Sequence, residues 1–309
     1  MNRCLKLNSM KVVAVSALAL CLALTALSAE SPQSPSPPRL AGIVSLAARP
    51  CAVLEVTALH QSAAKWFVLS EGQREEDVEV TGIAPEKGSV EVAWQGTNNT
   101  TVRLNDTTNL PLPGIVLEDA GISAVLQLFD QFTNRILLRW PVLPATSFSL
   151  RASAKDQAGA AQVLAQALVA EALSIIPDGE KFLMIVPNSK AAVVKPHAPL
   201  AKASTNSGTK TQATPRGSGT VEQEVMGPGL IDFRDADVSQ AADIYSLMLG
   251  RKLDRSERLP AGGTISIITQ TPLTKEEGVY ALETLLLWSG IKMVPVGEDR
   301  LKAVRDREY

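Results

Sequence analysis

The chain has 309 residues, of which 45% are hydrophobic and 20% charged, as in ordinary globular proteins. That length allows one large domain or two to three modest ones. Residues 1–29 contain Arg3, Lys6 and Lys11 and no acid, so the remainder carries 27 Lys and Arg against 32 Asp and Glu. The resulting net charge of −5 argues against a general nucleic-acid-binding role, because that role needs a basic face.

Residues 1–29 have the pattern of an export signal. An uncharged apolar run, 12–29, follows the basic residues and ends in small residues suited to signal peptidase. Met10 is an alternative start to Met1 and would give a more compact signal. The run is just long enough to span a bilayer, so retention as an inner-membrane anchor is the alternative to cleavage. We therefore expect a periplasmic protein, exported by a Sec-type signal, that contacts the membrane only if this segment is uncleaved.

Residues 30–39 are rich in proline and predict a stiff, solvated spacer. Beyond the signal the chain has a single cysteine, Cys51, so no intramolecular disulfide can form there. The export compartment permits disulfides. We interpret Cys51 as a buried structural thiol, with a disulfide to a partner as the alternative.

A small all-β module is predicted at residues 40–108. Six short strands are expected in it, at 42–46, 52–56, 66–69, 78–83, 89–94 and 101–104. Val90, Val92 and Trp94 alternate with Glu91 and Ala93, so one face of that strand should be buried and the other solvated. Proline and glycine between these segments supply the turns.

The rest of the chain contains an internal duplication, at residues 111–187 and 228–309. The first copy opens Pro-Gly-Ile-Val-Leu-Glu-Asp-Ala-Gly-Ile-Ser, and the second opens Pro-Gly-Leu-Ile-Asp-Phe-Arg-Asp-Ala-Asp-Val-Ser. The offset is 115 at Pro113 and Pro228 and 118 near the ends of the copies, so about three net insertions separate them. Such a self-match indicates duplicated structural units.

The second copy predicts two capped helices. Asp237 stands where a helix cap belongs, and Gln240 follows at capping-box spacing. An apolar stripe of helical period comes next, with Val238, Ala241, Ala242, Tyr245 and Leu249. The second helix should begin at Thr274, with Glu277 completing a capping box, and end at Gly290. Its expected buried positions are Leu282, Leu285 and Leu286.

Strands of the second copy are expected at 230–233 and at 264–268, where Ile265 and Ile267 should be buried. A hairpin around Gly297 closes the unit. In the first copy the corresponding positions are filled by Phe148, Leu150, Leu164, Ala167, Leu168 and Gly179, and by the helical stripe Ile122, Val125, Leu126, Phe129 and Phe132. Gly121 stands at the first cap, where it caps less well than Asp.

The predicted fold class is therefore multidomain, with the all-β module followed by two small α+β units of order β-α-β-β-α-β-β. Each unit is expected to form its own apolar-cored bundle. Residues 188–227 join the units. They are rich in Ala, Ser, Thr, Gly, Pro and Lys and lack an apolar period, which predicts a disordered linker.

The second copy resembles the periplasmic N-terminal domains of bacterial secretins and the related short signalling domain of some outer-membrane transporters. The resemblance is carried over residues 228–305 by Phe-Arg-Asp-Ala-Asp-Val, Thr-Ile-Ser-Ile, Pro-Leu-Thr-Lys-Glu-Glu, Ala-Leu-Glu-Thr-Leu-Leu and Gly-Ile-Lys-Met-Val. It extends more loosely over 113–187. In that family such domains stack into rings and dock partner proteins, without catalytic residues. No long run of amphipathic strands follows, so we expect the chain not to be the pore itself.

The β-module is similar to the periplasmic homology region of the type II secretion clamp protein and to type IV pilus pilot proteins. Three segments carry this similarity: Trp66-Phe-Val-Leu-Ser-Glu-Gly, Val80-Thr-Gly-Ile-Ala-Pro and Gly88-Ser-Val-Glu-Val-Ala-Trp-Gln-Gly. In that family the module meets the first periplasmic domain of a secretin, which implies an envelope partner here.

The sequence predicts no catalytic, cofactor-binding or metal-binding residues, and no cofactor. His60 and His197 have no second ligand at metal-site spacing. No P-loop, dinucleotide fingerprint or nucleophile elbow is present. The acid pairs Asp235/Asp237 and Glu276/Glu277 fall at expected helix starts, where negative charge complements the helix dipole, so we interpret them as caps.

Two hypotheses of function follow. The first is a non-enzymatic periplasmic scaffold or adaptor of a secretin-based envelope machine, of the type II secretion or type IV pilus kind. Its partners would be a secretin or other secretion and pilus components, with self-association as an option. The second is an exported module that binds peptidoglycan or another glycan. That function would use exposed aromatic residues, but Trp66, Trp94, Trp140 and Trp288 fall within expected strands or helices, where core packing is the preferred interpretation.

Overall fold

A computed structural model describes residues 37–46, 50–57, 64–94, 99–196, 225–227, 229, 231–254, 264–269 and 271–306, without the side chains of 225 and 235. The export signal, most of the spacer, His60, His197 and most of the linker lie outside these residues. None of the helices in the described part of the chain is both long and apolar enough to cross a membrane. The contacts below lie within one compact unit, residues 38–55 and 66–309.

The first part of the described chain is all β, as predicted. Its strands are β1 (Arg39–Ser45), β2 (Cys51–Val56), β3 (Lys65–Ser70), β4 (Arg74–Glu75), β5 (Val78–Ala84), β6 (Ser89–Trp94) and β7 (Thr100–Arg103), with a 3-10 turn η1 (Pro85–Lys87). All six predicted strands are present, and β4 is an addition. Strands β4 to β7 form an antiparallel sheet of their own.

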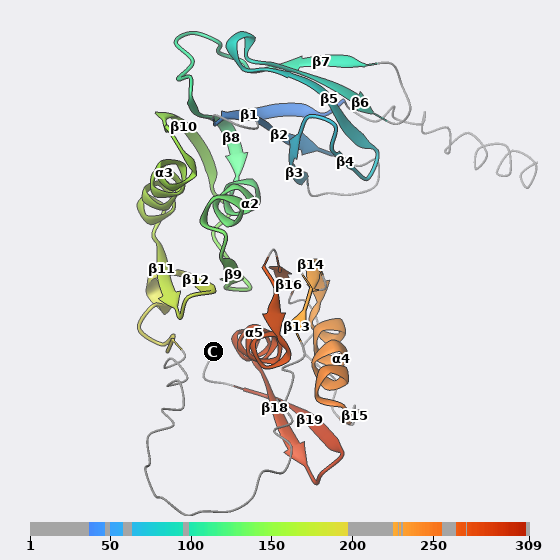
Figure 1. Ribbon diagram of the computed structural model, residues 1–309. Helices are drawn as coiled ribbons and strands as arrows, with labels where there is room; N and C mark the ends of the chain where they lie inside the picture. Colours follow the sequence, from blue (N-terminus) through green and yellow to red (C-terminus); the bar gives the residue numbers. More distant parts are fainter. Residues whose placement is uncertain are drawn as a thin grey trace, which may run out of the picture. The chain divides into compact units, whose positions relative to one another are not determined.

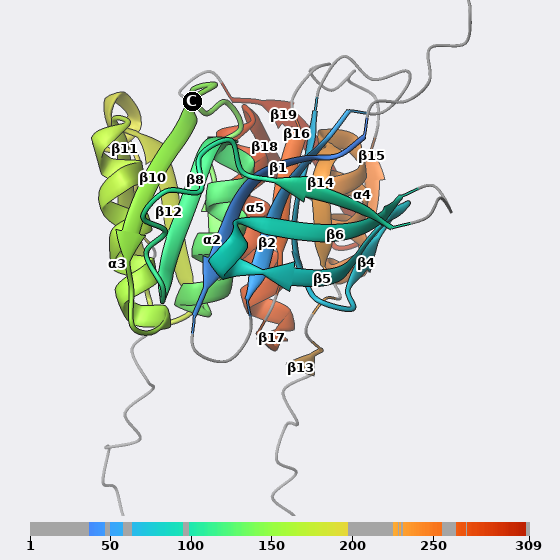
Figure 2. The same cartoon turned by 90° about the horizontal axis from the view of Figure 1, so that it is seen from above.

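The first three strands do not form a sheet of their own. They continue a five-stranded sheet of order β10-β8-β1-β2-β3, in which β8 and β10 belong to the first repeat. Figure 2 shows β10, β8, β1 and β2 of this sheet in that order. The predicted division near residue 108 therefore does not coincide with a break in hydrogen bonding. The reason is visible in β1, where Leu40, Ala41, Ile43 and Val44 are all buried, so the strand needs neighbours on both edges and both faces.

The first repeat has the predicted order β-α-β-β-α-β-β (Figure 1). Its elements are β8 (Gly114–Gly121), α2 (Ile122–Thr133), β9 (Ile136–Arg139), β10 (Ser147–Ser153), α3 (Gln157–Ala170), β11 (Leu173–Asp178) and β12 (Phe182–Pro187), followed by a 3-10 turn η2 (Asn188–Lys190). Strands β8 and β10 pair antiparallel. The β11–β12 hairpin is joined by β9, which runs parallel to β12.

The second repeat has the same topology. Its elements are β14 (Asp232–Asp237), α4 (Val238–Leu249), β15 (Lys252–Asp254), β16 (Thr264–Ile268), α5 (Lys275–Trp288), β18 (Ile291–Val296) and β19 (Arg300–Arg305). Strands β14 and β16 pair antiparallel, and β15 runs parallel to β19 of the β18–β19 hairpin. Two short strands, β13 (Val225–Met226) and β17 (Leu273–Thr274), pair in addition. The chain is thus a mixed α+β protein of several small domains, two of which share one topology.

The duplication extends to an irregularity of the backbone. In β8 the register shifts between the pairs Leu117–Leu150 and Ala120–Phe148, so one extra residue bulges there. In β14 the register shifts between Phe233–Ile267 and Ala236–Ile265 in the same way. A bulge at an equivalent position in both copies is a designed feature of the strand rather than a defect.

The capping predictions are confirmed. Asp237 and Thr274 both form capping boxes, with Gln240 and Glu277 as their partners. Gly121 caps α2 without a side-chain hydrogen bond. The predicted stripe of α4 is buried at Val238, Ala241, Ala242 and Tyr245. The prediction for the last member of the stripe is wrong, because Leu249 lies in the final turn of α4 and is exposed. The helix is already ending at that point.

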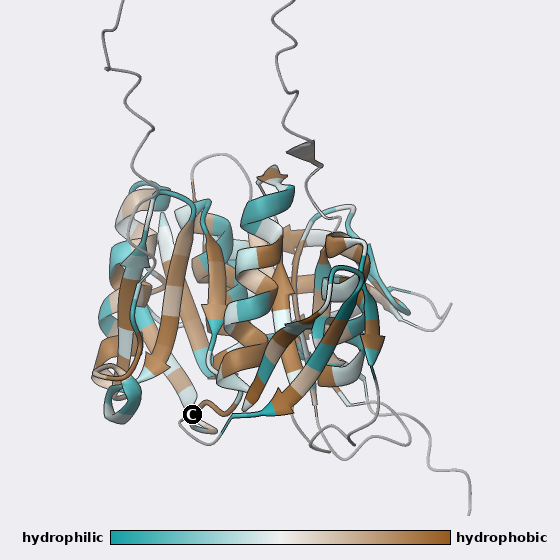
Figure 3. Cartoon of the chain, turned by 90° about the horizontal axis from the view of Figure 1, so that it is seen from below, coloured by the Kyte–Doolittle hydropathy of each residue, from teal (hydrophilic) through white to brown (hydrophobic). Residues whose placement is uncertain are grey.

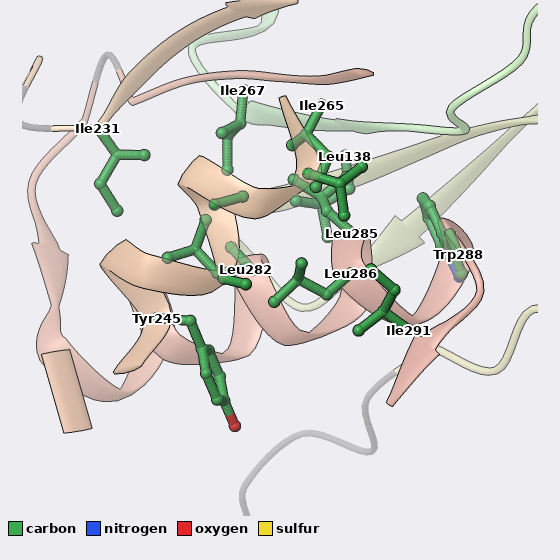
Figure 4. Close-up of a cluster of buried hydrophobic side chains, with 14 of the residues drawn as sticks. Leu138, Ile231, Tyr245, Ile265, Ile267, Leu282, Leu285, Leu286, Trp288 and Ile291 are labelled. Carbon is green, nitrogen blue, oxygen red and sulfur yellow. The ribbon is translucent and has the colours of Figure 1, made fainter. Parts of the chain in front are cut away.

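The two repeats are not separate bundles, because they share a core. Alternate residues of the sheet β11-β12-β9 point to opposite sides, so the sheet is covered on both faces. Leu137, Leu173, Leu183 and Ile185 join the first core with α2 and α3. Ile136, Leu138, Phe182, Met184 and Val186 join the second core with α4, α5 and β16. Figure 4 shows Leu138 next to Leu285 and Ile265.

Trp140 and Trp288 sit in this shared core, with ring centroids 5.3 Å apart. Their predicted packing role is confirmed. The sheets around the cores are built from largely hydrophobic strands, whereas the helices carry more hydrophilic residues (Figure 3).

The ends of the predicted linker are ordered, contrary to the expectation of disorder over 188–227. Residues 188–190 form η2, and Val194 is buried in the shared core. At the other end β13 pairs with β17. The physical reason is that these ends carry apolar side chains beside folded strands, whereas the composition argument averages over the whole segment.

Candidate docking surfaces of the second repeat

The described residues offer no grouping of three or more His, Cys, Asp or Glu side chains that would hold a metal ion. Cys51 is buried, as predicted, and burial raises the pKa of its thiol to about 12. Asp237 accepts a hydrogen bond from the amide of Ser239 (2.7 Å), and Glu277 accepts one from the amide of Thr274 (2.8 Å). These two acids are caps.

In the first repeat, β8 leads into α2, and the edge of β8 that does not pair with β10 is covered by another strand. Strand β1 pairs antiparallel with β8, from Gly42 opposite Leu117 to Ser45 opposite Gly114. The bulge that follows is covered as well. The guanidinium of Arg39 donates hydrogen bonds to the carbonyls of Glu118 and Asp119, each at 3.2 Å.

The helix of the first repeat is covered on the same side. Ala124 and Leu128 of α2 are fully buried in a core that includes Ala41, Val53 and Val68 from β1, β2 and β3. Gln127 donates a hydrogen bond from its amide to the carbonyl of Trp66 (3.2 Å). Strands β1 to β3 thus close both the edge of β8 and one side of α2.

The second repeat leaves the equivalent surface open. Within the described residues β14 pairs only with β16, so its other edge carries no strand. A hollow lies between this edge and α4, and it is lined by Asp232, Phe233, Arg234, Ala236, Gln240, Asp243 and Ile244. Because α2 and α4 start at equivalent caps, Gln240, Asp243 and Ile244 correspond to Ala124, Gln127 and Leu128. We call this surface the β14 groove.

The β14 groove is apolar on its floor and charged at its edge. Phe233 and Ile244 are half-buried, and Leu247, one turn beyond Ile244, is 76% exposed. Arg234 forms ion pairs with Asp232 (3.3 Å) and with Glu75 of β4. Partial burial raises the pKa of the Asp232 carboxyl above its usual range. One cation is thus shared by two carboxylates.

A second surface follows from the contact between the repeats. The outer face of the sheet β11-β12-β9 receives α5. Lys181 donates a hydrogen bond to the carboxylate of Glu277 (2.7 Å), and the hydroxyl of Tyr280 donates one to the carboxylate of Asp178. In the same sheet Phe182 and Met184 are 6% and 1% exposed, because α5 and its neighbours cover them.

The equivalent face of the second repeat is charged and solvated. Register places Arg300 and Lys302 of β19 where β12 has Phe182 and Met184, and Lys252 pairs with Arg300 as Ile136 pairs with Phe182. The outward residues of this sheet are Lys252, Asp254, Lys292, Val294, Val296, Arg300, Lys302 and Val304. We call this surface the β18–β19 face. It carries four cations and one carboxylate around three valines.

Sequence reasoning missed both surfaces. The pattern that the two copies share predicts their common fold, whereas the two surfaces depend on positions at which the copies differ. When the copies are aligned position by position, apolar residues of the first copy, such as Phe182 and Met184, correspond to charged residues of the second, Arg300 and Lys302. That substitution pattern signals a face that is covered in one copy and exposed in the other.

No protein-family model matches this chain, and no curated protein matches it in sequence.

Proposed function

We propose that this protein is a non-enzymatic periplasmic scaffold or adaptor of a secretin-based envelope machine, of the type II secretion or type IV pilus kind. One observation carries the docking role. Two surfaces are covered in the first repeat, namely the edge of β8 and the outer face of β11-β12-β9. The equivalent surfaces of the second repeat are both uncovered among its described residues. The first repeat organises the molecule, and the second repeat presents surfaces to partners.

The class of machine is proposed on the resemblance of residues 228–305 to secretin N-terminal domains and of the β-module to a secretin-binding module. The shared order β-α-β-β-α-β-β of the two repeats is in keeping with that resemblance. The capping acids Asp237 and Glu277 are used structurally, which supports a role without catalysis.

The glycan-binding alternative has less support. Trp140 and Trp288 pack on each other inside the shared core and cannot stack on a sugar there. Retention of the protein on insoluble peptidoglycan in the absence of any secretin would favour this alternative.

The proposal is tested by affinity purification of the tagged protein from envelope extracts, followed by identification of the proteins that accompany it. We expect a secretin or another component of a secretion or pilus machine. A variant with Lys292→Glu and Lys302→Glu, on the β18–β19 face, is expected to recover less of the partner than the matched variant Gln162→Glu/Gln166→Glu on the exposed side of α3. Deletion of the protein that leaves secretion, piliation and secretin assembly unchanged would contradict the proposal.

A further inference from the structure

We propose that the β14 groove accepts an extended segment of a partner protein, which adds to the sheet as a strand antiparallel to β14. The segment carries a basic residue followed by small and aliphatic residues. This inference deepens the docking function proposed above and rests on it for the existence of a partner. Addition of a strand to an open sheet edge is a recurring mode of peptide recognition, in which backbone hydrogen bonds give affinity and side-chain pockets give specificity.

The first ground is the internal comparison of edges. Strand β8 pairs with β10 on one side and with β1 on the other, whereas β14 pairs with β16 and, in the part of the chain that is described, with nothing else. Both strands carry the bulge at the same position. Strand β1 pairs with residues 114–117 of β8, directly before the bulge, so the added strand is expected beside the equivalent part of β14, at Asp232 and Phe233.

The second ground is the space beside that edge. Ile244 occupies the position of Leu128, which is 0% exposed under β1 to β3, and Phe233 occupies that of Leu117. In the second repeat these side chains line a hollow. Side chains from one face of an added strand would enter it and cover Phe233 and Ile244, as Val53 and Val68 help to cover α2.

The chemistry of the segment follows from the charges and from β1. Asp232 lines the hollow, and the cation beside it, Arg234, is shared between Asp232 and Glu75. A basic side chain complements two carboxylates that share one cation, and in the first repeat Arg39 of β1 lies over the carbonyls of Glu118 and Asp119, which correspond to those of Arg234 and Asp235. A small residue is expected opposite Phe233, because a Cβ at Gly42 would lie 2.6 Å from the carbonyl oxygen of Val116.

A partner protein fits better than a second copy of this chain. The strand with the required pattern, β1, already lies between β8 and β2 in its own sheet and would have to leave it. The charges of β14 have a further role. Charged residues on an edge strand oppose indiscriminate pairing, so they select a segment of complementary charge.

The test uses the purified protein and a fluorescent peptide with the sequence of residues 38–46, Pro-Arg-Leu-Ala-Gly-Ile-Val-Ser-Leu. The control peptide has proline at both Ile43 and Val44, so that whichever of these amides faces β14 is removed. We expect saturable binding by fluorescence anisotropy for the first peptide and none for the second. Hydrogen exchange should show new protection of the amides at 231–236.

Two variants locate the site. Ile244→Lys places a charge on the apolar floor, and Asp232→Lys reverses the charge at the edge. Each should weaken peptide binding at least about tenfold. Gln162→Lys, exposed on α3, should leave it unchanged. Urea midpoints equal to that of the unmodified protein would show that the variants fold. If Ile244→Lys does not fold, Asp232→Lys still tests the site, because Asp232 is exposed.

Three outcomes would overturn the inference. They are the absence of peptide binding, protection that appears at 114–117 instead of 231–236, and a dimer of the free protein that Asp232→Lys dissociates. The last result would make a second copy the occupant of the groove. If the peptide fails to bind the unmodified protein while a secretin still co-purifies with it, the scaffold function stands and only the strand inference fails.

Discussion

Gly121 and Asp237 stand at the same N-cap position of α2 and α4, and their contrast shows how packing overrides local preference. Asp is the better cap, because its carboxylate satisfies backbone amides of the first turn. At position 121, however, a Cβ would lie 2.7 Å from the indole of Trp66, which packs there. The first copy therefore trades a cap for close contact between α2 and the β-module.

Gly121→Asp should destabilise the protein by about 1–3 kcal/mol, because overpacking against Trp66 outweighs the added cap. Urea unfolding followed by circular dichroism measures the change. The double variant Gly121→Asp/Trp66→Ala should lose less stability than the sum of its two single variants. Stabilisation by Gly121→Asp alone would contradict this interpretation.

Cys51 is expected to be an inert thiol. Burial raises its pKa to about 12, so almost no thiolate forms near neutral pH, and the sulfur is inaccessible. In the chain without residues 1–29, where Cys51 is the one cysteine, a thiol reagent should react only at the rate of unfolding. Rapid labelling of the native protein would disprove burial and restore the disulfide alternative.

At the scale of elements, the start of α4 should depend on pH. The hydrogen bonds from Ser239 lower the pKa of the Asp237 carboxyl in the folded state. A depressed folded-state pKa means that the cap contributes fully above the ordinary Asp pKa and is lost as pH falls through the depressed value. Near neutral pH the cap is therefore intact.

Acidification below pH ~4 should fray the first turn of α4. Hydrogen exchange at the Ser239 amide measures this, after correction for the intrinsic pH dependence of exchange. Asp237→Asn is the matched control, since it retains a capping oxygen but does not titrate. The variant should show no acid-dependent loss of protection. If the Ser239 amide of the unmodified protein were equally protected above and below pH ~4, the proposed role of the Asp237 cap would be contradicted.

At the scale of the whole molecule, the shared sheet β11-β12-β9 couples the two repeats. It is buried on one face by the helices of its own repeat and on the other by α5. Both repeats should therefore unfold in one transition, because neither repeat can unfold without exposing the core of the other.

Phe182→Arg with Met184→Lys copies the residues of β19 into β12 and should uncouple the repeats. Two buried apolar side chains are replaced by charges without partners, so the urea midpoint should fall and the transition should broaden or split. The reverse exchange, Arg300→Phe with Lys302→Met, lies on the solvated β18–β19 face and should change stability by about 0.5 kcal/mol or less. It should instead promote self-association. Equal midpoints for the two double variants would refute the assignment of the faces.

The sequence alone determined the order of elements in both repeats, their caps and their hairpins. Capping boxes such as Asp237–Gln240 and Thr274–Glu277, and the turn at Gly297, depend on residues within a few positions of one another, so their signals are local. The duplication could be recognised for the same reason, because both copies contain the same local pattern. The buried thiol of Cys51 was also predicted, because Cys51 is the single cysteine beyond residues 1–29 and has no intramolecular disulfide partner there.

Only the tertiary structure decided which edges and faces are covered. The pairing of β1 with β8 joins residues 69 to 75 positions apart, and the Lys181–Glu277 contact joins residues 96 apart. The sequence shows that β9 and β12 are apolar but not that both faces of their sheet are buried, nor that the equivalent face in the second repeat is solvated. Coverage depends on contacts between distant segments, and neither periodicity nor capping encodes such contacts.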